Sequence, residues 1–208
     1  MAALVSTDEQ RILLRNVSWD TYERILADQM DRSAPRFTFD RGELEIMSPS
    51  PEHERYNDAV SVIIDLLADE LNLEIESLGA TTFKREDIER GFEPDSCFYV
   101  QNESRVRGKS RIDLSIDPPP DFIVEIDISS QSRDKFPIYG DLGVPEVWLY
   151  DGVKMAIFTL DGGGYVECDR SAALPPVASA DLTKLLEARK TSGRTTWLRG
   201  VRLWARGL

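Results

Sequence analysis

Two carboxylates thirty positions apart, Asp95 and Glu125, are the side chains of this sequence best suited to chemistry. Asp95 follows Pro94 at the start of a strand-like run, and Glu125 lies inside the run 121–128. Mg²⁺ prefers oxygen ligands, and proteins usually hold it with one or two carboxylates, waters and substrate phosphate groups. This pair of acids therefore suits a magnesium-dependent phosphodiesterase.

The run 121–128 alternates between two kinds of side chain, as a strand with one apolar face does. Successive side chains of a strand point to opposite faces. One face is apolar, and the other carries Asp121, Ile123, Glu125 and Asp127. Acids in an otherwise apolar strand are costly to bury unless a cationic group meets them. We therefore expect a cation at this face.

The spacing of the two acids matches the metal-binding acids of PD-(D/E)xK nucleases. In that superfamily a Lys two positions after the second acid helps to position or activate the attacking water. Here that position holds Asp127, which has the opposite charge. A compensating cation lies downstream, because Lys135 and Tyr139 are four residues apart and would share one face of a helix. Pro137 fits such a helix only in its first turn.

Helices and strands alternate in the pattern that would position these residues. A helix is expected after a Ser18 N-cap, and a long helix over 52–73, whose apolar residues recur at helical spacing. A hairpin over 37–46 and another helix near 132–142 are also expected. Further strands are predicted over 74–78, 80–85, 94–100, 121–128, 146–150, 153–160 and 165–168. This pattern predicts the α/β fold class: a mixed sheet flanked by helices, with C-terminal β-hairpin strands.

The block 119–151, with the upstream segments 44–50 and 53–54, closely resembles the Uma-two type family of bacterial restriction-endonuclease-like proteins. The Gly-Val-Pro-Glu-x-Trp run at 143–148 is the part most specific to that family. The resemblance covers about residues 15–185. It implies a restriction-endonuclease-like core of the PD-(D/E)xK superfamily, dependence on Mg²⁺, and a homodimer. Our leading interpretation is that the chain acts on nucleic acid, DNA in the first place, with Mg²⁺ or Mn²⁺ as the metal.

The resemblance assigns roles to individual residues. Asp95 and Glu125 match the acids of the family, and Lys135 matches its displaced Lys. Many members read Glu-Val-Leu-Ser-Pro-Ser where this chain places Asp127 two residues after Glu125. Asp127 is then a third metal ligand, a partner for Lys135, or a sign of lost activity. The resemblance leaves these three interpretations open.

His53 is the only histidine, and it continues the apolar stripe of the long helix at its N-terminal end. In related resolvase-like nucleases an acid from this helix reaches the active site, so His53 is a candidate catalytic residue. Its alternative role is to cap the apolar stripe. The loop 105–111, with basic residues at alternate positions, could contact phosphate groups or could simply be solvated.

Composition suits one soluble domain of 208 residues with a net charge of −12. That charge argues against a large nonspecific DNA-binding surface, which depends on Lys and Arg. The segment 181–208 holds seven basic residues against two acids, with Trp and Leu interleaved. This segment could contact nucleic acid, but the interleaved apolar residues favour docking on an acidic surface of this chain or of a partner subunit. The predicted division is a domain over 1–185 and a basic, aromatic extension over 186–208.

Membrane and secretory roles are not expected. No apolar run approaches the roughly 20 residues that span a bilayer, and residues 1–5 lack the features of a signal peptide. Two cysteines, Cys97 and Cys168, suit a reducing compartment, and we expect both to be buried and free. The expected location is the cytoplasm.

Three functions are compatible with the two acids. The first is a Mg²⁺-dependent endonuclease that hydrolyses phosphodiester bonds, in which Asp95, Glu125, Lys135 and His53 act in catalysis and Asp95, Glu125 and Asp127 bind metal. The second is a catalytically inactive binding module on the same fold, which the acidic charge, Asp127 and Pro137 favour. The third is a two-carboxylate glycosidase, for which the separation of the acids would be decisive.

Overall fold

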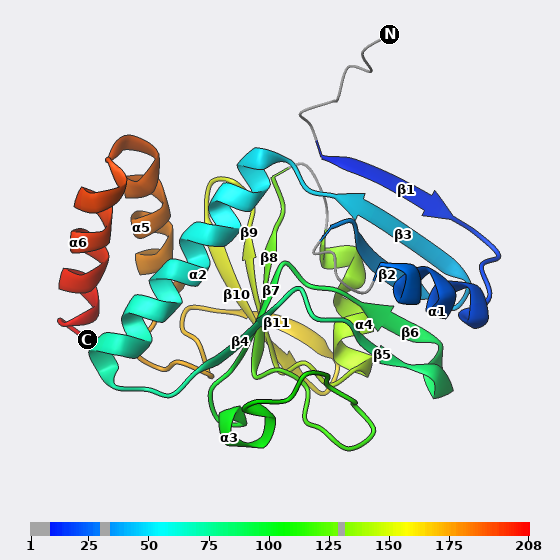
Figure 1. Cartoon of the computed structure of the whole chain (residues 1–208). Helices are drawn as coiled ribbons and strands as arrows, with labels where there is room; N and C mark the ends of the chain where they lie inside the picture. The colour runs from blue at the N-terminus through cyan, green and yellow to red at the C-terminus, as the bar shows by residue number, and fades with distance from the viewer. Residues whose placement is uncertain (1–8, 30–33, 129–131) are drawn as a thin grey trace, which may run out of the picture.

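The computed structural model of the chain describes residues 9–29, 34–128 and 132–208 (Figure 1). Within them lie two sheets flanked by helices, which confirms the mixed α/β class. The antiparallel five-stranded sheet has the order β1 (Gln10–Leu14), β3 (Glu43–Ser48), β2 (Arg36–Asp40), β6 (Arg90–Phe92) and β5 (Phe83–Arg85). Residues 1–5, where no signal peptide is expected, lie outside the described residues.

The six-stranded sheet is mixed. Its order is β11 (Gly164–Cys168), β10 (Met155–Asp161), β9 (Glu146–Tyr150), β8 (Phe122–Ile126), β7 (Ser96–Tyr99) and β4 (Glu76–Gly79). Strands β8 and β9 are parallel, and the other neighbours are antiparallel. A parallel pair needs a crossover, and this one contains the short 3₁₀ helix η2 (Ser132–Lys135) and helix α4 (Phe136–Asp141).

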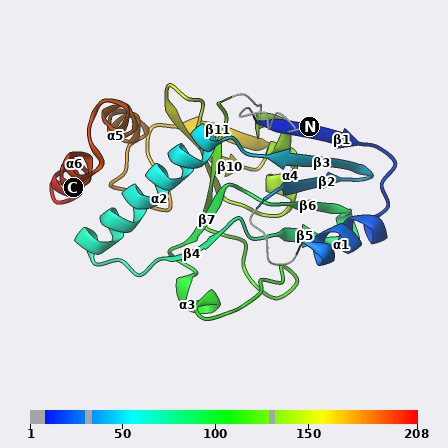
Figure 2. The ribbon, with the colours of Figure 1, turned by 45° about the horizontal axis from the view of Figure 1, so that its top comes forward.

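Helix α2 (Pro51–Leu71) packs along one face of the six-stranded sheet, as Figures 1 and 2 show. Ser50 is its N-cap and accepts a hydrogen bond from the amide of His53 at 3.1 Å, whereas Asn72 ends it in the left-handed conformation. Its apolar stripe packs against Phe122, Val124 and Ile126 of β8. The predicted helix over 52–73 is therefore confirmed to within two residues at each end.

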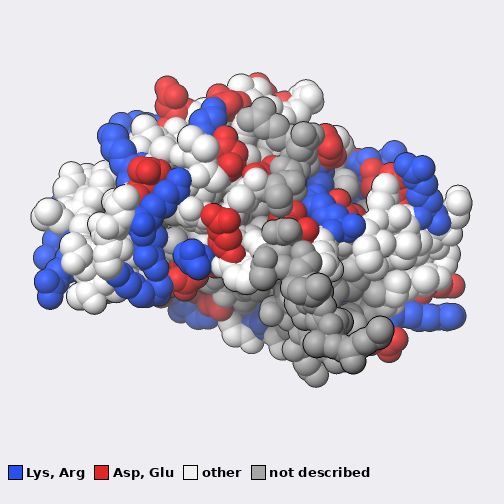
Figure 3. All heavy atoms as spheres, turned by 90° about the horizontal axis from the view of Figure 1, so that it is seen from above, with Lys and Arg blue, Asp and Glu red and all other residues white. Residues whose placement is uncertain are grey.

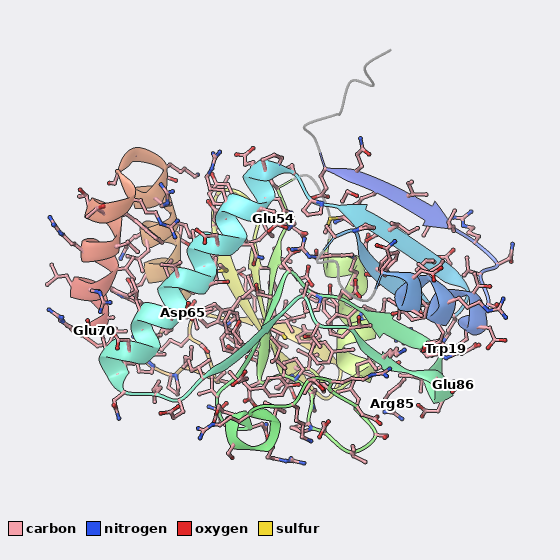
Figure 4. All side chains as sticks on the ribbon, viewed as in Figure 1. Trp19, Glu54, Asp65, Glu70, Arg85 and Glu86 are labelled. Atoms are coloured by element: carbon pink, nitrogen blue, oxygen red, sulfur yellow. The ribbon has the colours of Figure 1, made fainter. Side chains whose placement is uncertain are left out.

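Helices α5 (Ser179–Thr191) and α6 (Arg194–Ala205) pack beside α2, where Trp197 joins the core. Arg202 pairs with Glu70 at 2.9 Å, and Arg206 pairs with the same carboxylate at 2.8 Å. Figure 4 labels Glu70 near the C-terminal end of α2, and Figure 3 shows Lys and Arg gathered on the α5–α6 side. The basic segment thus docks on an acidic face of its own chain. Helix α5 crosses the predicted boundary at 185/186, and the two-part division stays a prediction.

Helix α1 (Trp19–Asp28) covers the five-stranded sheet, where Tyr22 stacks on Phe39 with ring centroids 4.8 Å apart. This second sheet was not anticipated, since no strand was expected at β1 or β6. Arg90 ties it to α4: its guanidinium binds Asp40 at 2.8 Å, Asp141 at 2.7 Å and the carbonyl oxygen of Pro137 at 2.8 Å.

Two local predictions need correction. The helix expected near 132–142 begins only at Phe136, because Pro137 lacks an N–H group and occupies the first turn, and Lys135 becomes its N-cap. The basic loop expected over 105–111 begins inside a short helix, α3 (Glu103–Val106). Glu103 there forms a bidentate pair with Arg107.

Two predictions from composition can be compared with the described residues. No helix among them combines the length and the apolar character that crossing a membrane requires. Both cysteines are free, as expected, but only Cys97 is buried. Cys168 is partly exposed because it lies on β11, the edge strand of its sheet, so the prediction of burial is wrong for Cys168.

Candidate active site

Sheet register brings Asp95 to the strand that carries Glu125. Strands β7 and β8 are antiparallel with Ser96 opposite Val124, so the start of β7 lies beside the end of β8. The amide of Ile126 donates a hydrogen bond to Oδ2 of Asp95 at 2.7 Å. Acids thirty positions apart in the sequence therefore share one buried site.

Two cationic side chains form ion pairs with Asp95. Its Oδ1 lies 2.9 Å from Nη1 of Arg36 on β2 and 2.9 Å from Nε2 of His53 on α2. Both contacts are ion pairs between buried side chains. Burial alone would raise the pKa of Asp95, but His53 and Arg36 hold it below its usual value. Asp95 is thus ionised at neutral pH.

His53 lies between two carboxylates. Its Nδ1 is 3.1 Å from Oε2 of Glu9, and its Nε2 faces Asp95. Burial lowers the pKa of His53, but contact with Asp95 and Glu9 outweighs burial and raises the pKa to about 9. The ring is therefore protonated at neutral pH. His53 both ends the apolar stripe of α2 and reaches Asp95, so the two roles considered for it are compatible.

Glu125 is mainly protonated at neutral pH, whereas Asp95 is ionised. It is 3% exposed, its Oε1 accepts a hydrogen bond from the hydroxyl of Tyr139 at 2.9 Å, and its Oε2 lies 3.4 Å from Oγ of Ser132. Burial and the negative charge of Asp95 raise the pKa of Glu125 to about 8. Two neighbouring acids with opposite pKa shifts are typical of functional sites, although structural networks also produce them.

Asp127 follows β8 and is nearly buried. The amide and the hydroxyl of Ser132 donate hydrogen bonds to its two carboxylate oxygens, at 2.8 and 2.5 Å. Asp127 thereby caps the first turn of η2, the segment that leads to Lys135. This contact gives Asp127 a structural role that none of the three interpretations from sequence included.

Lys135 is 9% exposed, and its ammonium group forms an ion pair with Oε1 of Glu45 on β3 at 2.7 Å. The second oxygen of Glu45 pairs with Arg11 of β1 at 3.1 Å. The positive charge of Lys135 still acts on Glu125, whose pKa it lowers against the larger effect of burial. Lys135 therefore lies at the site, where it pairs with Glu45, a residue that was not predicted from sequence to belong to the site.

Sequence reasoning missed Glu9, Arg36 and Glu45, and it gave Tyr139 no partner. Glu45 carries the same signal as Glu125, because it is an acid between Leu44 and Ile46 in an apolar strand. Glu9 and Arg36 carry no comparable local signal. The basic loop 105–111 does not join the site: it begins in α3 and lies at the end of β8 opposite Glu125 (Figures 1 and 2).

The carboxylates fit Mg²⁺ in their chemistry. A cation beside Glu125 would favour its ionised form and offset the repulsion from Asp95 that raises its pKa. Two carboxylates completed by waters are a usual Mg²⁺ ligand set. In the described parts of the chain, no three His, Cys, Asp or Glu side chains already form a ligand cluster. Metal binding at Asp95 would have to loosen its contacts with Arg36 and His53.

The comparison with protein families gives the class of protein, which is restriction-endonuclease-like. The chain belongs to the Uma2 family, whose model matches residues 19–189 and carries the description "Putative restriction endonuclease". A solved structure from Anabaena variabilis ATCC 29413, titled as a putative nuclease of DUF820, is 17% identical in sequence. It aligns over 79% of this chain and 92% of its own, with a TM-score of 0.49. The search of curated proteins found no match.

Proposed function

We propose that this chain is a Mg²⁺-dependent endonuclease that hydrolyses phosphodiester bonds of DNA. The observation that carries the proposal is the buried pair of Asp95 and Glu125, joined through the Ile126 amide and shifted in opposite directions in pKa. Membership of a restriction-endonuclease family supports the same chemistry.

Each residue of the site has a distinct task in this proposal. Asp95 and Glu125 hold the metal, with Asp127 as an auxiliary ligand. When bound, Mg²⁺ or Mn²⁺ would supply positive charge at the phosphate and lower the pKa of a coordinated water. The ammonium group of Lys135 steadies the negative charge that develops on the phosphate, and His53 keeps Asp95 ionised. Tyr139 orients Glu125 through its 2.9 Å hydrogen bond.

Nicking of supercoiled plasmid DNA across a series of divalent metals tests the proposal. Asp95→Asn and Glu125→Gln keep the shape of each side chain and remove its charge. We expect each to lower the Mg²⁺-dependent rate by about 100-fold or more, given that loss of even an outer-shell partner costs about 10- to 100-fold. Circular dichroism and thermal melting check that the variants fold. Folded variants that cut at the wild-type rate would refute the assignment.

A second candidate function is a nuclease-fold binding module without cleavage. The observation in its favour is that Arg36 and His53 already neutralise Asp95 at 2.9 Å without any metal. Calorimetric titration with Mg²⁺ and Mn²⁺ separates the two candidates. A binding module should show no metal affinity that Asp95→Asn removes, whereas the endonuclease should show one. The family match gives no support to the glycosidase alternative.

The quaternary structure and the location of the protein also belong to the proposal. We propose a homodimer, as the family resemblance implies, and sedimentation velocity of the purified chain tests it. A single monomeric species at all concentrations would contradict the dimer. We propose the cytoplasm as the location, which cell fractionation tests.

A further inference from the structure

Glu45 lies on an interior strand of the five-stranded sheet. Strand β3 is paired on both sides, so Glu45 lies opposite Leu13 of β1 and Thr38 of β2. Its two carboxylate oxygens have separate partners, Lys135 at 2.7 Å and Arg11 at 3.1 Å. With its backbone fixed and its carboxylate shared, Glu45 has little freedom to move.

Lys135 has a less rigid support. It lies at the junction of η2 and α4, and its side chain is a long flexible stem with a charged end. Among the described residues, Glu45 is the carboxylate with which its ammonium group pairs. Without Glu45, nothing described would hold that group in one orientation.

We propose that Glu45 is a positioning residue that holds the ammonium group of Lys135 in one place at the site, with Arg11 fixing the second oxygen of Glu45. The inference rests on the proposed function, in which Lys135 steadies charge on the phosphate. It adds a residue from the five-stranded sheet to a site whose acids lie on the six-stranded sheet. Residues of both sheets then surround the ammonium group of Lys135.

A labelling experiment tests the contact without requiring activity. The full chain is treated with an amine-acetylating reagent, and acetylation of Lys135 is followed by mass spectrometry relative to the exposed Lys184. Glu45→Gln should raise the relative rate at Lys135 several-fold. Glu43→Gln is the matched control, because Glu43 also lies on β3 and pairs with an exposed Arg15 at 3.1 Å. An unchanged Lys135 rate in Glu45→Gln would overturn the proposal.

Steady-state cleavage by the same variants tests the consequence for the reaction. Glu45→Gln should lower kcat by about 10- to 100-fold, the effect of a misplaced group, and leave KM nearly unchanged. Glu45→Asp keeps the charge and should retain more activity, and Glu43→Gln should match the wild type. Faster labelling with unchanged kcat would overturn the positioning role. If the wild-type chain failed to cut DNA with every metal tested, the proposed function would be refuted instead. The labelling experiment would still decide whether Glu45 holds Lys135.

Discussion

The amide of Ile126 donates a hydrogen bond to Oδ2 of Asp95 at 2.7 Å, so the acid that precedes β7 is fixed to the strand that carries Glu125. The separation of the two carboxylates therefore depends on the β7–β8 register and not on a flexible loop. A one-residue slip in that register would also turn every side chain of β8 to the opposite face. The metal chemistry proposed here depends on this pairing.

Stability should fall with rising pH because of Glu125. Its pKa is raised from 4.5 to about 8, so its contribution to the free energy of unfolding is fully present below pH 4.5 and is lost as pH rises through 8. Urea denaturation of the metal-free chain between pH 5 and 8 measures this loss. Glu125→Gln should show a smaller decline than the wild type, and parallel declines would contradict the raised pKa.

Mg²⁺ should stabilise the chain more strongly as pH rises from 6 to 8. Metal binding requires ionised carboxylates, and Glu125 carries a proton below about pH 8. The measurement is the shift in Tm on adding Mg²⁺ at each pH. The shift should vanish in Asp95→Asn, and a shift that is equal at all pH values would argue against a ligand role for Glu125.

Tyr139→Phe should destabilise the fold through Glu125. The substitution removes the 2.9 Å hydrogen bond and leaves a buried carboxyl oxygen without that donor, which costs about 1–3 kcal/mol. The control is Tyr56→Phe, because Tyr56 also packs in the core, against Tyr150. Urea denaturation compares the two variants. Equal losses would mean that the hydroxyl of Tyr139 contributes no more than that of Tyr56.

Trp197→Ala should show how much the docked helices α5 and α6 contribute to the free energy of unfolding. Trp197 is 3% exposed in the core beside α2, and removing a buried Trp side chain costs about 3–5 kcal/mol. Leu203→Ala on the same helix is the control, because Leu203 is 74% exposed.

A chain ending after residue 185 tests the predicted division, since a domain complete at that point would keep the Tm of the full chain.

The sequence was sufficient to predict the features that local pattern determines. Asp95 and Glu125 could be found because each interrupts an apolar run, and α2 because its stripe repeats at helical spacing. The partners of these residues could not be found in the same way. Arg36, Glu9 and Glu45 come from a second sheet, and their approach to the site is set by how the two sheets pack.

Lys135 illustrates why a correct candidate can have an unexpected partner. Its position four residues before Tyr139 predicted a helix that would direct it to the acids of β8. Pro137 starts that helix later, and the long side chain of Lys135 reaches Glu45 instead. Residue spacing constrains how far a lysine can reach, but the charges that other strands bring within that distance determine its partner.

The guanidinium of Arg90 restricts how the two sheets can separate. It joins Asp40 on the five-stranded sheet to Pro137 and Asp141 of α4. Helix α4 also carries Tyr139, which bonds to Glu125. A motion that separates the sheets must either break the Arg90 contacts or draw Tyr139 away from Glu125. As long as the Arg90 contacts hold, opening between the two sheets therefore also removes the Tyr139 hydrogen bond from Glu125.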